Sequence, residues 1–87
     1  MQYLHSREYL NHGDVVVVNC SHKCNVMLMD DANFQNYKAG QRFKYHGGSY
    51  EMLPARISAP STGNWNVVLD LGGGSATVRH SIQILRA

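Results

Sequence analysis

The chain has 87 residues, with eight Lys and Arg against six Asp and Glu, and a formal net charge of +2 at neutral pH. A chain of this length forms one domain, residues 1–87, and its 44% apolar content permits a core. The basic residues form no block, so electrostatics gives little reason to bind nucleic acid or an anionic membrane. The start has no apolar signal segment and no apolar run approaches membrane-spanning length, so we expect a cytoplasmic protein.

The first ten residues fit either a strand or a turn. The next runs flank the triplet "SHK", residues 21–23, which fits the loop of a hairpin. This register places Cys20 opposite Cys24 and Val18 opposite Val26, and one face becomes wholly apolar. The other face is also mostly apolar and needs cover, which makes homo-oligomerisation plausible; it carries Val15, Val17, Met27 and Met29.

The segment "DANFQNYKAG", residues 31–40, predicts a short helix or helical turn. Asp31 suits the N-cap and Gly40 suits the position after the last turn. Phe34 and Tyr37 lie three residues apart, so both would dock on the core.

Two further hairpins are predicted from glycines. Gly47 and Gly48 fit a two-residue turn that places Tyr45 opposite Tyr50. A loop over residues 72–75 would pair residues 65–71 with residues 76–82, so that His80 faces the apolar side beside Val67 with a depressed or absent ionisation.

The segment "PARISAP", residues 54–60, reads as a short strand at a sheet edge because prolines flank it. Together these segments predict an all-β fold, a small antiparallel β-sandwich or jelly-roll of seven or eight strands with one short helix or helical turn.

Several blocks of the sequence, in order, carry a resemblance to a known family: "GDVVVVNCSHKCNVMLMDDANFQNY", "YHGG", "LPARI" and "GNWNVVLDLGGGSATVRHSI". The chain resembles the uncharacterised bacterial family catalogued as domain of unknown function eighteen-eighty-three. The resemblance covers nearly the whole chain and implies an all-β bacterial domain, joined in some relatives to a TIR domain. It implies a recognition role for such a domain but brings no catalytic residues to carry over.

The group Cys20, His22 and Cys24 allows three interpretations. Structural zinc needs four ligands, and no second cysteine pair completes such a set. A disulfide across the hairpin is geometrically near reach but disfavoured in a cytoplasmic protein. We therefore interpret both cysteines as small apolar residues of the core, and predict neither a metal nor a cofactor.

The remaining candidates for a site are aromatic rings and histidines near the turns. Tyr37, Tyr45 and Tyr50 could form a platform that stacks a sugar or a nucleobase. His22 and His46 lie at predicted loop tips, where they could contact the same ligand. The five residues are the predicted ligand-binding set.

We predict a non-catalytic recognition or interaction domain that binds a small ligand or an effector protein through loops at one end of the sandwich. No catalytic constellation is evident, so we expect no enzyme activity. The alternatives are a small enzyme that uses a histidine or a thiol, and a metal-binding domain.

Overall fold

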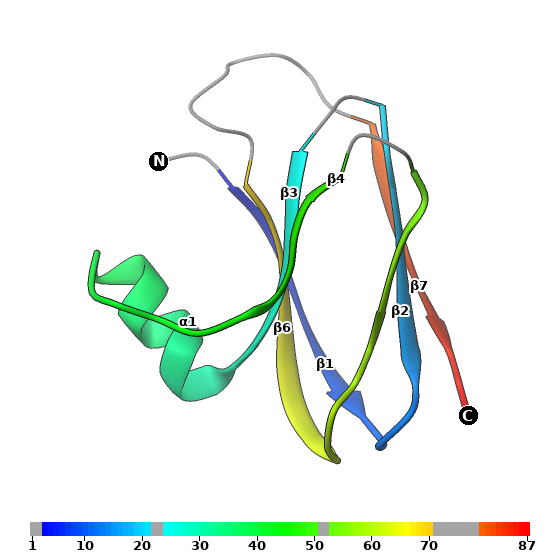
Figure 1. Ribbon diagram of the computed structural model, residues 1–87, viewed down its shortest axis with the longest axis horizontal. Helices are drawn as coiled ribbons and strands as arrows, with labels where there is room; N and C mark the ends of the chain where they lie inside the picture. The colour runs from blue at the N-terminus through cyan, green and yellow to red at the C-terminus, as the bar shows by residue number, and fades with distance from the viewer. Residues whose placement is uncertain (1–2, 22–23, 51–52, 71–78) are drawn as a thin grey trace.

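Seven antiparallel strands form two facing sheets in the computed structural model, which describes residues 3–21, 24–50, 53–70 and 79–87 (Figure 1). The predicted small β-sandwich with one short helix is confirmed. The strands are β1 (Tyr3–Leu10), β2 (Val15–Cys20), β3 (Cys24–Asp30), β4 (His46–Tyr50), β5 (Ala55–Ser58), β6 (Gly63–Asp70) and β7 (His80–Leu85). One sheet has the order β1-β6-β3-β4 and the other has the order β5-β2-β7. The sequence left the first ten residues open between strand and turn, and Tyr3–Leu10 forms the edge strand β1.

Consecutive strands of the chain lie in opposite sheets, except for β3 and β4. The predicted pairing of β2 with β3 is therefore wrong, since β2 pairs with β5 and β7 while β3 pairs with β4 and β6. The predicted apolar face is nevertheless real, because its residues meet across the interior instead of along one sheet. Val16, Val18, Cys20, Cys24, Val26 and Leu28 all belong to one buried cluster.

The two glycine-based hairpins are also corrected. Gly47 and Gly48 lie inside β4, opposite Met27 and Val26 of β3, and Tyr50 faces Cys24 instead of Tyr45. Strand β6 pairs with β1 and β3, so it does not pair with β7. His80 is exposed and lies opposite Cys20 of β2, away from its predicted neighbour Val67. The predicted loop over residues 72–75 lies outside the described residues.

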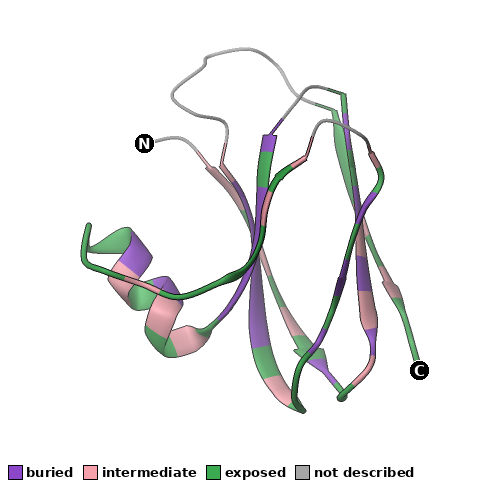
Figure 2. Ribbon diagram, viewed as in Figure 1, coloured by how far each residue is buried: buried purple, intermediate pink, exposed green. Residues whose placement is uncertain are grey.

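The interior between the sheets is a continuous apolar layer. Figure 2 shows that strands of both sheets carry buried positions. The central strand β6 contributes Trp65, Val67 and Leu69, while Ile82 and Ile84 of β7 pack against the same cluster from the other sheet. The edge position predicted for residues 54–60 is confirmed, because β5 borders the three-stranded sheet. The peptide bond before Pro54 is cis.

The helix α1 (Asp31–Lys38) covers the outer face of the four-stranded sheet (Figure 1). Phe34 and Tyr37 dock as predicted, and they form a second buried cluster with Met27, Met29 and Val68. The N-cap is Asp30 instead of the predicted Asp31, and its carboxylate accepts from the backbone N–H of Asn33 at 2.8 Å. Gly40 follows the C-cap with φ of +72°, the left-handed conformation that ends many helices.

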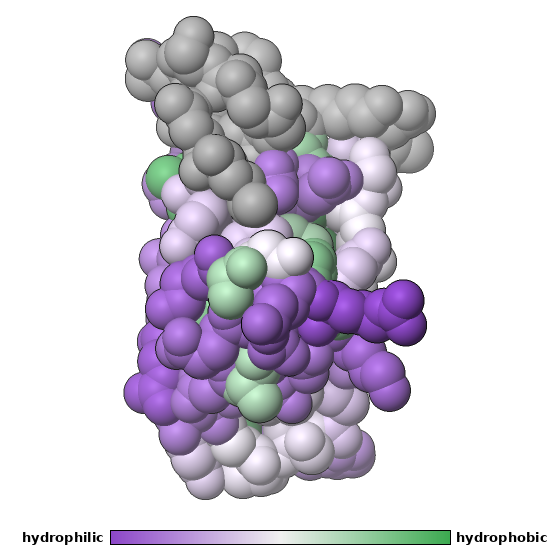
Figure 3. All heavy atoms as spheres, turned by 90° about the vertical axis from the view of Figure 1, so that its left-hand side faces the viewer, coloured by the Kyte–Doolittle hydropathy of each residue, from purple (hydrophilic) through white to green (hydrophobic). Residues whose placement is uncertain are grey.

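The helix also changes the surface that was expected to drive self-association. Met27 and Met29 are buried under α1, and Val15 and Val17 are half-buried on the other sheet. The face that carries α1 is mostly hydrophilic (Figure 3). The four residues therefore do not form one face: α1 covers the two methionines, and the two valines lie on β2 of the other sheet. Within the described residues, no helix is long and apolar enough to cross a membrane.

A buried carboxylate fixes the end of the sandwich where β1 turns into β2. Asp14 accepts hydrogen bonds from the backbone N–H groups of Asn11 and Ala87 at 2.9 and 2.8 Å, and from the Arg86 guanidinium at 3.0 Å. These donors, the Ala87 N–H first, lower the pKa of Asp14. The carboxylate thus connects the β1–β2 turn to the segment that follows β7.

Gly47 allows a close approach that no other residue type would tolerate. A Cβ at this position would collide with the carbonyl oxygen of Val26 and lie 3.0 Å from Cδ1 of Ile57. Its φ of +118° is also unfavourable for residues with a side chain. The passage of β4 between β3 and β5 therefore depends on glycine.

We expect Gly47→Ala to lower the free energy of unfolding by roughly 2–4 kcal/mol, because backbone strain of this kind costs about 1–3 kcal/mol and the collision adds to it. Urea denaturation measures the loss. Gly40→Ala is the matched control: a Cβ at Gly40 meets nothing within 4 Å, and about 1 kcal/mol is expected there. Equal losses in the two variants would contradict the close approach of β4.

Candidate functional site

An open hollow of about 570 Å³ lies where the end of β3, the start of α1 and the start of β4 meet. Its volume falls in the range of small-molecule sites. Residues from five segments line it: Met29, Asp30, Asn33, Phe43, Lys44, Tyr45, His46 and Trp65. Aromatic side chains and polar groups share the lining.

Trp65 forms the inner wall of this hollow, which we call the aromatic hollow. Its side chain comes from β6, where Trp65 lies opposite Asp30 of β3, and only 7% of it is exposed. The indole N–H donates to the carbonyl oxygen of Ser61 at 2.9 Å, which fixes the ring plane. The His46 ring stands edge-on to it, with centroids 5.9 Å apart and planes at 67°. Trp65 is thus a rigid apolar surface with its one donor already satisfied.

The polar side of the hollow is organised around Asn33. Its side-chain N–H donates to the Asp30 carboxylate at 2.8 Å, and its side-chain oxygen accepts from the Lys44 backbone N–H at 2.8 Å. The helix start thereby holds the segment that leads into β4. The Lys44 ammonium, the Tyr45 hydroxyl and the His46 ring form no hydrogen bond to the part of the chain that the structure describes, so they remain available to a ligand.

A row of rings connects the hollow to the packing beneath α1. Tyr37 and Phe43 meet edge to face at 5.1 Å, and Phe43 and Tyr45 follow at 5.6 Å. Tyr37 is 3% exposed, and its hydroxyl donates to the Asp70 carboxylate at 2.9 Å. Burial, together with Asp70, raises the pKa of Tyr37. The inner rings are therefore structural, and Tyr45 is the outer, accessible member of the row.

A polar network connects the first turn of α1 to strands β1 and β6. Asn66 is 1% exposed and is fully bonded: its oxygen lies 2.8 Å from Nε2 of His5, and its amide donates to Asp31 at 2.8 Å. The Arg7 guanidinium binds the Asp31 carboxylate through two hydrogen bonds of 3.1 and 2.7 Å. Arg7 first and Asn66 second lower the pKa of Asp31 to about 2. The network holds the first turn of α1 on the sheet.

The structure brings together two of the five predicted ligand-binding residues. Tyr45 and His46 line the aromatic hollow. Tyr37 lies in the buried row beneath α1, and Tyr50 packs against the core cluster at the other end of β4. His22 lies outside the described residues. The platform of three tyrosines is therefore not assembled, because the hairpin that would have paired Tyr45 with Tyr50 does not form.

Sequence reasoning missed Trp65, Phe43 and Lys44 as lining residues. Trp65 belongs to the core cluster, and it also lines the hollow. Phe43 and Lys44 lie in the segment that leads into β4. The sequence did offer one signal for these lining residues: the run "RFKYH" follows the helix-capping run "DDAN" closely along the chain.

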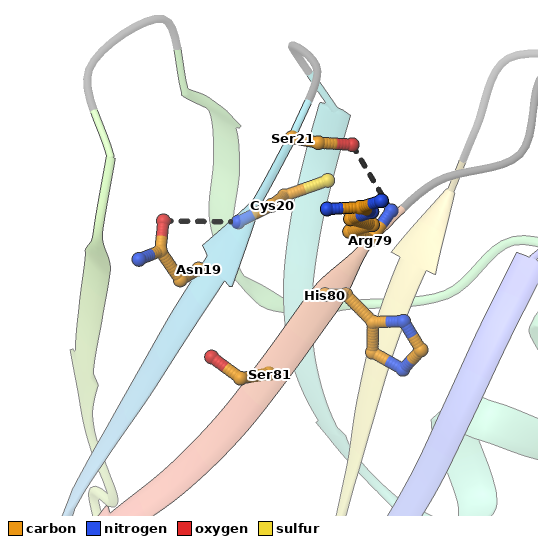
Figure 4. Close-up of a pocket in the computed structure, with 6 residues that line it drawn as sticks. All are labelled: Asn19, Cys20, Ser21, Arg79, His80 and Ser81. Atoms are coloured by element: carbon orange, nitrogen blue, oxygen red, sulfur yellow. Dashed lines mark hydrogen bonds between the residues drawn. The ribbon is translucent and has the colours of Figure 1, made fainter.

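A second, smaller hollow of about 320 Å³ lies where β2 ends and β7 begins (Figure 4). Asn19, Cys20, Ser21, Arg79, His80 and Ser81 line it. Cys20 and Cys24 are both free and buried, in agreement with the interpretation of these residues as part of the apolar core. Among the described residues, no three His, Cys, Asp or Glu side chains gather closely enough to hold a metal ion.

Comparison with known proteins identifies a family for this chain. A family model described as Domain of unknown function (DUF1883) matches residues 1–87. No curated protein and no solved structure matches the chain significantly.

The carboxylate of Asp31 gives a test of the network behind the hollow. Its pKa is depressed in the folded state, so its contribution to stability is present above the unfolded pKa of about 3.9 and is lost as the pH falls toward about 2. Carbon-detected NMR titration should place the Asp31 transition near that lower value. Arg7→Gln should move it upward, because Arg7 is the largest cause of the shift. An unchanged Asp31 titration in Arg7→Gln would show that the pair does not persist in solution.

Proposed function

Since the chain belongs to the family described as Domain of unknown function (DUF1883), a description that names no activity, we propose its function from the site: it is a recognition domain that binds a small ring-bearing ligand in the aromatic hollow. The ligand stacks a flat face, of a sugar or a nucleobase, on Tyr45 and against Trp65. The observation that carries this proposal is the convergence of these rings with His46 and Lys44 around one open volume of about 570 Å³.

The state of the polar groups supports binding over catalysis. The Asp30 carboxylate accepts from the backbone and side chain of Asn33, and the Trp65 donor is used by Ser61. The one carboxylate that lines the hollow is thus engaged with Asn33 at the helix start. The groups left for a ligand are one ammonium, one hydroxyl and one imidazole at the rim, which suit hydrogen bonding to a polar ring.

The rigidity of the walls supports the same conclusion. Trp65 is fixed by its strand and by Ser61, and the segment before β4 is fixed by Asn33 and by the packing of Phe43 on Tyr37. A ligand therefore meets a surface that is already in place, and little conformational entropy is lost on binding. Tyr45, which is 46% exposed, presents the most accessible ring.

The single tryptophan of the chain makes binding measurable without a label. Because Trp65 lines the hollow, a stacking ligand should change its fluorescence, and titration with adenosine and with a glucose oligosaccharide distinguishes the two ring classes. Amide NMR shifts should then concentrate on residues 43–46 and on Trp65. Shifts that gather on a different surface would move the site elsewhere.

Tyr45→Ala should weaken binding of whichever probe is recognised by about 1–3 kcal/mol, since this is the usual contribution of one stacking ring. Tyr9→Ala is the matched control: Tyr9 is 56% exposed and lies outside the hollow. Isothermal titration calorimetry on both variants compares the losses. Equal losses, or no binding of either probe by the wild-type protein, would contradict the proposal.

A further inference from the structure

Cys20 and Cys24 are the only two cysteines of the chain, and they meet inside the sandwich. Cys20 ends β2 in one sheet, and Cys24 begins β3 in the other. Both side chains belong to the same buried cluster. Three residues connect them, so the chain crosses from one sheet to the other at this point and brings the two thiols together.

The surroundings of the two thiols differ. Cys20 lines the smaller hollow together with Arg79 and His80, whereas Cys24 does not reach it. Cys20 also lies directly opposite His80 in the pairing of β2 with β7, and directly opposed side chains share one face of a sheet. Figure 4 shows the sulfur of Cys20 and the ring of His80 on the same side of the strands, away from Asn19 and Ser81.

The Cys24 thiol is the one that holds its proton. Burial first, and the neighbouring Cys20 thiol second, raise the pKa of Cys24 to about 12. Since the thiolate is the nucleophile in thiol chemistry, Cys24 is a poor first attacker. Arg79 lines the same hollow as Cys20, and within the described part of the chain its guanidinium forms no ion pair.

We propose that Cys20 and Cys24 form a reversible dithiol site for small-molecule disulfides, in which Cys20 attacks first, His80 accepts its proton and Cys24 completes the internal disulfide. This site lies at the end of β2, on residues that do not line the aromatic hollow. It is therefore independent of the proposed recognition function. Arg79 and His80 favour a disulfide that carries carboxylates, such as oxidised glutathione.

The steps balance with that disulfide as the oxidant. The Cys20 thiol gives its proton to His80, and the thiolate attacks one sulfur of the disulfide; a mixed disulfide forms, and the leaving thiolate takes the proton from His80. The Cys24 sulfur then attacks the Cys20 sulfur, and the Cys24 proton passes to the departing thiolate, which is released as the second thiol. Two protein thiols are oxidised, and one external disulfide is reduced to two thiols.

The full-length protein is incubated with oxidised glutathione near neutral pH, and intact mass is followed with time. We expect the wild-type chain to lose the mass of two hydrogen atoms. Cys24→Ala should stop at a glutathione adduct on Cys20, and Cys20→Ala should remain unmodified over the same period. Circular dichroism shows whether each variant is folded.

The relative reactivity of the two thiols can also be measured on the wild-type protein, without substitution of a buried residue. A short pulse of iodoacetamide followed by peptide mapping identifies the faster thiol, and we expect Cys20 to be alkylated at least tenfold faster than Cys24. In strong denaturant the two rates should become similar, because the fold creates the difference. Equal rates in the native protein would overturn the assignment of Cys20 as the attacking thiol.

His80→Gln tests the proton acceptor. We expect it to slow formation of the Cys20 adduct by about tenfold or more, as loss of a general base does. His12→Gln is the matched control, because His12 is exposed and lines neither hollow, and its rate should equal that of the wild type. An unchanged rate in His80→Gln, or disulfide-linked dimers in place of the internal disulfide, would overturn the proposal.

Discussion

The apolar layer between the two sheets is the interaction on which the rest of the structure depends. Val16 and Val18 project from one sheet, and Val26, Val67 and Leu69 project from the other; all five are fully buried. Full burial of one such side chain contributes about 1.5–3 kcal/mol, so this layer supplies much of the driving force for folding. Because consecutive strands other than β3 and β4 lie in opposite sheets, the layer also holds together strands that do not pair with their neighbours in sequence.

The four-stranded sheet buries apolar residues on both sides, because α1 covers part of its outer face. Met27, Met29 and Val68 occupy the outward positions of β3 and β6, and Phe34 and Tyr37 of the helix cover them. Covering this face also buries the amide of Asn66, whose hydrogen bonds to His5 and Asp31 compensate for the loss of water. The polar network and the aromatic packing thus hold the same helix at its start and along its length.

The position of α1 determines the aromatic hollow. Asn33 of the helix accepts a hydrogen bond from the Lys44 backbone, and Tyr37 packs against Phe43. These two contacts fix the segment before β4 in its position beside the hollow. The opposite end of the sandwich has a different chemistry, with two thiols, an imidazole and a guanidinium. One fold therefore presents a group of aromatic rings at one end and a thiol pair at the other.

The glycines show why local turn rules were misleading. Gly47 and Gly48 are residues typical of a hairpin turn, yet they lie inside strand β4, where Gly47 passes close to the Val26 carbonyl. Tyr45 consequently precedes β4 whereas Tyr50 ends it. Among the described residues of the predicted ligand-binding set, Tyr45 and His46 reach the aromatic hollow. The residues that complete it come from a helix cap and a central strand far along the chain.

The sequence by itself determined the fold class, the helix over residues 31–38 and the inward face of each central strand. These follow from alternation, caps and composition, which are local properties of the chain. Only the tertiary structure decided which strands pair, which rings line the hollow and that His80 faces Cys20. The physical reason is that alternation tells which side of a strand is buried, whereas an inward residue is equally well covered by a neighbour in its own sheet or by the facing sheet.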